Sequence, residues 1–121
     1  MRKAYAHEAL VEMSATADPD AIGAAVTVAL CGEWTHEPPC PLAPHHTQAA
    51  RTEDRVRVRV RTLFVAEPSL EREVRRRIDR ALANGTQQTP IGATVRWQLV
   101  TSAEDAVREV EREHAERLIG S

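Results

Sequence analysis

The residues best suited to chemistry lie in one short segment, from Cys31 to His46. Both cysteines and three of the five histidines fall there, in the spacing C-x4-H-x3-C-x4-H followed directly by another histidine. Thiolate sulfur and imidazole nitrogen are the ligands that Zn²⁺ takes in tetrahedral sites, and short spacers let them converge. The segment therefore predicts a transition-metal site, with zinc as the expected ion and these candidate ligands: Cys31, His36, Cys40, His45 and His46.

Prolines are concentrated in the same segment: Pro38, Pro39, Pro41 and Pro44. They restrict the backbone and lower the entropy that is lost when ligands converge. The spacing lacks the C-x2-C pair of strong zinc motifs, so the prediction depends on ligand chemistry. The alternative is a loop without a metal, in a homodimeric ligand-binding or protein-interaction module.

A second alternative is a cysteine-dependent enzyme, with Cys40 as the nucleophile and His36 or His45 as its base. Nothing in the sequence indicates an orienting third residue or an oxyanion hole. Phosphate-binding glycine loops, HExxH and the nucleophile elbow are all missing from the sequence. We therefore expect a small metal-binding or metal-responsive accessory protein rather than an enzyme.

The first residues contain no apolar leader with a cleavage site, and no apolar run reaches the length of a membrane span. These features predict a cytoplasmic protein with no membrane partner. In a reducing compartment, Cys31 and Cys40 are expected to be thiols or metal ligands rather than a disulfide.

The composition predicts one domain that covers residues 1–121. The chain is 42% hydrophobic but only 3% aromatic, so its core must come from Val, Leu, Ile and Ala. A net charge of -2 at pH 7 leaves the class of partner open.

Hydrophobic periodicity predicts seven elements. Asp18-Pro19 and Ser69 resemble helix starts, and Gly32 and Asn84-Gly85 resemble helix ends. The expected elements are strand 3–14, helix 18–31, strand 46–52, strand 55–66, helix 70–84, strand 94–99 and helix 103–119.

This order is typical of an α+β, ferredoxin-like βαββαβ two-layer sandwich, with a four-stranded antiparallel sheet and an additional C-terminal helix. In that arrangement, Glu8 and Glu12 would face a row of arginines across the uncovered side of the sheet. The arginines are Arg55, Arg57, Arg59 and Arg61, and the residues expected to face the helices are Val56, Val58, Val60 and Phe64.

The same arrangement brings the Cys/His segment close to the start of the first strand and the end of the third. His7 is therefore a candidate for a supporting contact to the metal ligands, and Glu67 could also approach. The uncovered face offers no aromatic side chain on which bases could stack, so we expect no nucleic-acid partner.

The final expected helix has a narrow apolar stripe on a heavily charged surface. Such a stripe could close a homodimer or pack along the edge of the sheet. Its members are Val107, Val110, His114 and Leu118.

Overall fold

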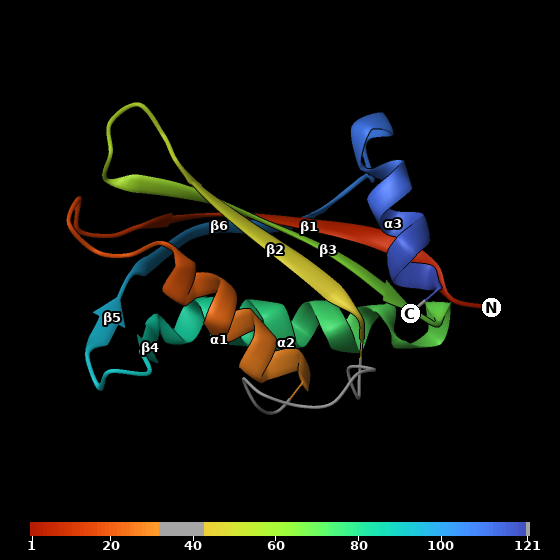
Figure 1. Cartoon of the computed structure of the whole chain (residues 1–121), viewed down its shortest axis with the longest axis horizontal. Coiled ribbons are helices and arrows are strands. Elements are labelled where there is room, and N and C mark those ends of the chain that lie inside the picture. The colour runs from red at the N-terminus through yellow and green to blue at the C-terminus, as the bar shows by residue number, and fades with distance from the viewer. Residues whose placement is uncertain (32–42, 121) are drawn as a thin grey trace.

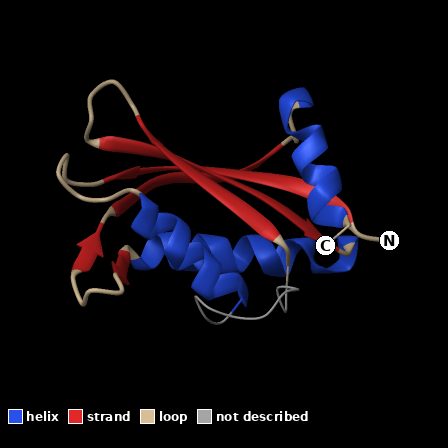
Figure 2. Ribbon diagram, in the orientation of Figure 1, coloured by secondary structure: helices blue, strands red, loops and turns tan. Residues whose placement is uncertain are grey.

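The computed structural model describes residues 1–31 and 43–120. A twisted sheet carries α1 and α2 on one face, called the inner face here, and the shorter α3 on the other, the outer face (Figures 1 and 2). The elements are β1 (Lys3–Glu12), α1 (Asp20–Cys31), β2 (His45–Arg51), β3 (Arg57–Ala66), α2 (Glu71–Asn84), β4 (Thr86–Gln88), β5 (Thr94–Arg96), β6 (Gln98–Asp105) and α3 (Arg112–Ile119). Short 3₁₀ turns, Pro68–Leu70 and Glu109–Glu111, precede α2 and α3.

The main sheet has four strands in the order β2-β3-β1-β6, and each neighbouring pair is antiparallel. This confirms the α+β class and the four-stranded antiparallel sheet. The expected ferredoxin-like order is not confirmed by this arrangement, because a separate two-stranded sheet, β4-β5, lies between α2 and β6 in the chain.

The inner core joins the sheet to α1 and α2. As expected from alternation, Val58, Val60 and Phe64 are buried there. Among the described residues, Phe64 is the largest fully buried side chain, and its ring lies 5.4 Å from that of Tyr5. Small and aliphatic residues complete this core, as the low aromatic content requires; the helices contribute Ile22, Ala25, Val26, Leu30, Val74, Ile78 and Leu82.

The expected charge pairs across the outer face are present for two of the arginines. Glu8 lies opposite Arg61 and Glu12 lies opposite Arg57, with N–O distances of 3.3 and 3.2 Å. The prediction was wrong for Arg55 because β3 begins only at Arg57.

Asp54 explains the late start of β3. Its carboxylate accepts hydrogen bonds from the backbone N–H groups of Val56 and Arg57, at 3.0 and 2.9 Å. These hydrogen bonds stabilise the carboxylate and lower the pKa of Asp54. The bond from the Arg57 N–H has the largest effect on this pKa. They hold a turn in which Arg55 takes a φ of 62° and Val56 is 46% exposed rather than buried.

The C-terminal part of the chain differs most from expectation. Residues 103–105, predicted to begin a helix, extend β6 and pair with β1, and α3 begins only at Arg112. Ser102, just before these residues, bonds to His7 of the neighbouring strand β1. Pairing with β1 satisfies the backbone of residues 103–105, so the tertiary contact overrides the local helical pattern.

The expected apolar stripe of the last helix covers part of the outer face. Ala115 is 4% exposed and packs with Ala6 and Leu63 in a second, small core. Leu118 and Val107 border this core, whereas Val110 is 87% exposed. Most of the stripe is therefore used within the chain.

The residues after α2 were expected to form a turn followed by one strand, but they form the β4-β5 hairpin and then β6. Trp97 separates these strands; its side chain is buried and its indole N–H donates to the carbonyl oxygen of Leu82 at 2.9 Å. Within the described residues, no helix has the length and hydropathy needed to cross a membrane.

Gly85 ends α2 in the left-handed conformation, with a φ of 69°, as the sequence predicted. A Cβ at this position would lie 2.4 Å from the carbonyl oxygen of Trp97. We expect Gly85→Ala to lower the free energy of unfolding by about 2 kcal/mol or more, through backbone strain and this contact.

Gly92 provides the matched control. Its φ is 88°, but a Cβ there would meet no atom within 4 Å. Gly92→Ala should therefore cost only the conformational strain, about 1 kcal/mol. Urea titrations of both variants measure the difference, and equal losses would contradict the role assigned to the Trp97 carbonyl.

Candidate functional site

The two described candidate ligands of the Cys/His segment lie on opposite faces of β2. His45 pairs with Phe64 and faces the helices, whereas His46 pairs with Leu63 and faces outward. One ion therefore cannot take both side chains. His36 and Cys40 lie outside the described residues, as does the side chain of Cys31, so these ligand predictions stay predictions.

His45 is held in a defined orientation at the junction of α1 and β2. Its Nδ1 lies 3.1 Å from the carbonyl oxygen of Ala43, and its Nε2 lies 3.0 Å from the Thr27 hydroxyl oxygen. Because a carbonyl only accepts, Nδ1 must carry a proton, and in the neutral ring Nε2 then accepts from Thr27. The lone pair of Nε2 thus points toward α1.

The surroundings of His45 form a hollow of about 310 Å³ between α1 and β2. Its wall includes Asp20, Gly23 and Thr27 from α1. Cys31 is the last residue of the same helix, four positions after Thr27. The junction thus combines an oriented imidazole with the backbone position of a predicted thiolate ligand.

His46 contacts a histidine that the sequence placed only in an apolar stripe. The ring centroids of His46 and His114 are 4.7 Å apart and the ring planes are tilted by 53°. Burial, followed by the nearby His46 and Arg117, lowers the pKa of His114. His114 was missed as a site residue because no sequence signal linked α3 to β2.

Arg61 organises the charged groups beside this histidine pair. Its guanidinium donates to both carboxylate oxygens of Glu111, at 2.7 and 2.8 Å, and to Asp105 at 2.6 Å. These bonds lower the pKa values of Glu111 and Asp105. Glu111 is therefore occupied, and the described ranges contain no group of three or more residues arranged to hold a metal ion.

His7 belongs to a separate network on the inner face. The guanidinium of Arg75 lies 3.0 Å from its Nδ1, while Asp79 and the Ser102 hydroxyl lie 3.0 and 2.8 Å from its Nε2. A guanidinium only donates, so Nδ1 accepts and Nε2 carries the proton of a neutral ring. Burial is the main cause that lowers the pKa of His7, and Arg75 adds to it.

This network does not have the geometry of a catalytic triad. Ser102 and Asp79 also bond to each other, and both contact the same nitrogen of His7. In a triad, the imidazole lies between the nucleophile and the acid, with one partner on each nitrogen. The arrangement instead links β1, α2 and β6.

The expected approach of Glu67 to the Cys/His segment stays a prediction, because residues 32–42 lie outside the described residues. Its carboxylate pairs with the amino group of Met1 at 2.9 Å. The contacts described for His7 and Glu67 are therefore to other parts of the fold.

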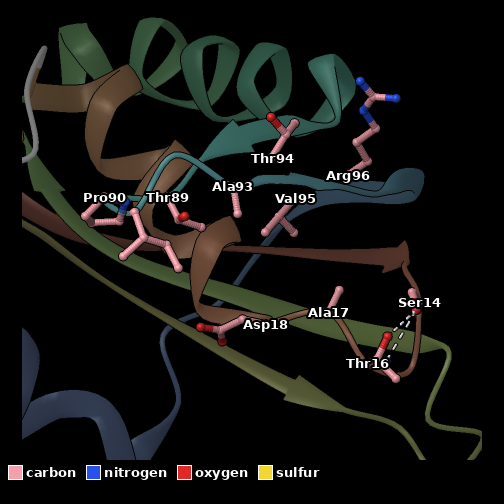
Figure 3. A pocket seen from close by; sticks show the side chains of 11 residues that line it. Ser14, Thr16, Ala17, Asp18, Thr89, Pro90, Ala93, Thr94, Val95 and Arg96 are labelled. Atoms are coloured by element: carbon pink, nitrogen blue, oxygen red, sulfur yellow. Dashed lines mark hydrogen bonds between the residues drawn. The ribbon is translucent and has the colours of Figure 1, made fainter.

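A hollow of about 880 Å³ lies between the β1-α1 turn and the β4-β5 hairpin (Figure 3). Alanine, proline and hydroxyl side chains make up much of its wall, and Arg51 braces the turn by donating to the carbonyl of Ser14 at 3.0 Å. The Thr89 hydroxyl is buried there without a hydrogen-bond partner among the described residues. The sequence predicted only a turn between the helix 70–84 and the strand 94–99, and the described residues of the wall include no group of catalytic side chains.

Comparison of the chain with protein-family models, curated proteins and solved structures finds no significant match in any of the three.

The pKa of His7 predicts how stability changes with pH. Because the folded pKa is lower than the unfolded value of about 6.5, the stabilisation from neutral His7 is present above that value and is lost as pH falls through the folded pKa. We expect the melting temperature of the wild-type protein to fall more steeply than that of His7→Gln between about pH 7 and pH 5. Parallel curves would show that His7 does not supply this pH dependence.

Proposed function

We propose that the protein binds a transition metal ion, most simply Zn²⁺, at the junction of α1 and β2, with His45 as a ligand. The observation that supports this function best is the orientation of His45, whose Nδ1–H bonds to the Ala43 carbonyl. Metal-binding histidines commonly donate their second ring N–H to a carbonyl, which fixes the tautomer and directs the other nitrogen to the ion. The remaining proposed ligands are Cys31, His36 and Cys40, from the sequence prediction.

Ligand chemistry supports zinc over harder ions. Thiolate and imidazole suit Zn²⁺, whereas Mg²⁺ and Ca²⁺ prefer carboxylate and carbonyl oxygen. Metal binding would replace the contact between His45 Nε2 and the Thr27 hydroxyl, which lies 3.0 Å away. The ion would then connect α1 to β2, as expected for a metal-responsive accessory protein.

We also infer that the main sheet with α1 and α2 is a ferredoxin-like domain, with the β4-β5 hairpin inserted before the last strand. The antiparallel pairs β1-β3, β2-β3 and β1-β6 support this inference, as does the position of both helices on one face. In this fold, the α1-β2 junction is a connection at one end of the sheet, where ligand-binding loops are commonly placed.

Metal content and Co²⁺ spectra test the proposed site. Protein purified without a histidine tag should bind about one equivalent of Zn²⁺ tightly, and its Co²⁺ form should show thiolate charge-transfer absorption. His45→Gln and Cys40→Ser should each weaken this binding by at least about tenfold, because each removes a ligand.

His46→Gln is the matched control, since the neighbouring side chain faces the other side of the sheet. It should leave the thiolate absorption and the tight Zn²⁺ affinity unchanged. If no metal binds, or if the His45 and Cys40 variants bind as the wild type does, the metal function is wrong and the interaction module is favoured.

A further inference from the structure

The outer face of the sheet carries a pair of imidazoles that is separate from the proposed zinc site. We propose that His46 and His114 form a second cation site, for a borderline ion that favours imidazole: Cu²⁺, Ni²⁺ or Zn²⁺. The inference goes beyond the proposed function, because the two sites lie on opposite faces of β2 and share no described ligand.

The geometry of the two rings fits a shared ion. With metal–nitrogen bonds of about 2.0 Å, two imidazoles on a tetrahedral ion have centroids roughly 5 Å apart. The centroids of His46 and His114 are 4.7 Å apart, and the 53° tilt keeps the rings from stacking face to face. The proposed site requires side-chain rotations that bring one nitrogen of each ring to a common point.

The surroundings allow an ion to enter and to keep water ligands. The rings border a hollow of about 240 Å³, and His46 is exposed to solvent. Besides the two histidines, the polar residues of the wall are Gln48, Glu111 and Arg61. Both carboxylate oxygens of Glu111 accept hydrogen bonds from Arg61. Two imidazoles with water in the remaining positions define an open site.

An ion at this position would join two elements that are far apart in the chain. His46 belongs to β2 and His114 to α3. The apolar contact of α3 with the sheet is small, since Ala115 packs against Ala6 and Leu63. Because a ligand stabilises the state that binds it, the ion should strengthen the docking of α3.

Ni²⁺ titration of a Cys31→Ser/Cys40→Ser variant tests the second site without thiolate ligands. Calorimetry should show one site, and hydrogen exchange of residues 112–119 should slow by at least about tenfold when Ni²⁺ is bound. His46→Gln and His114→Gln, each in this background, should weaken Ni²⁺ binding by at least about tenfold and remove the slowed exchange.

His45→Gln in the same background is the matched control, and it should keep both the affinity and the slowed exchange. His46 is exposed, so His46→Gln tests the site without a risk to folding. Equal Ni²⁺ binding by the His46 and His114 variants, or binding that depends on His45, would overturn the second site. Neither result would affect the thiolate spectrum that tests the proposed zinc site.

Discussion

The pleat of the β-strand is the constraint on which the arrangement of this protein depends. Successive side chains of a strand point to opposite faces, so the side chains of neighbouring residues do not bind the same ion on one face of the sheet. His45 and His46 illustrate this rule: one faces Thr27 of α1 and the other contacts His114 of α3. The same alternation divides β1 between an inner core with α1 and α2 and an outer core with α3.

Each face of the sheet has one polar network that supplements a core of small side chains. On the inner face, neutral His7 connects β1 to α2 and β6. On the outer face, Arg61 is only 8% exposed and its planar guanidinium binds Glu111 and Asp105 together. A lysine could not reproduce this fork, because its ammonium group lacks the fixed set of donors. Such networks favour one packing arrangement because each buried group needs its partners.

Local patterns predicted the parts of the fold where neighbours along the chain dominate. Alternation identified Val58 and Phe64 as inner residues, and Asn84-Gly85 identified the end of α2. The pattern failed at residues 103–105, where pairing with β1 decides the structure. Sequence reasoning also named His45 and His46 as candidate ligands, which stays a prediction, but it did not find the partners of these histidines. The contact between His46 and His114 depends on how α3 packs on the sheet, which no short-range spacing encodes.

The β4-β5 hairpin has a consequence for how this protein could change during evolution. Its tip carries Ile91, which is 91% exposed, and Gly92, beside which a side chain would meet no atom. The hairpin lies at the end of the sheet away from the start of β2 (Figure 1). Insertions are best tolerated at exposed tips of this kind. The chain can therefore lengthen or acquire new surface there while both histidine positions keep their geometry.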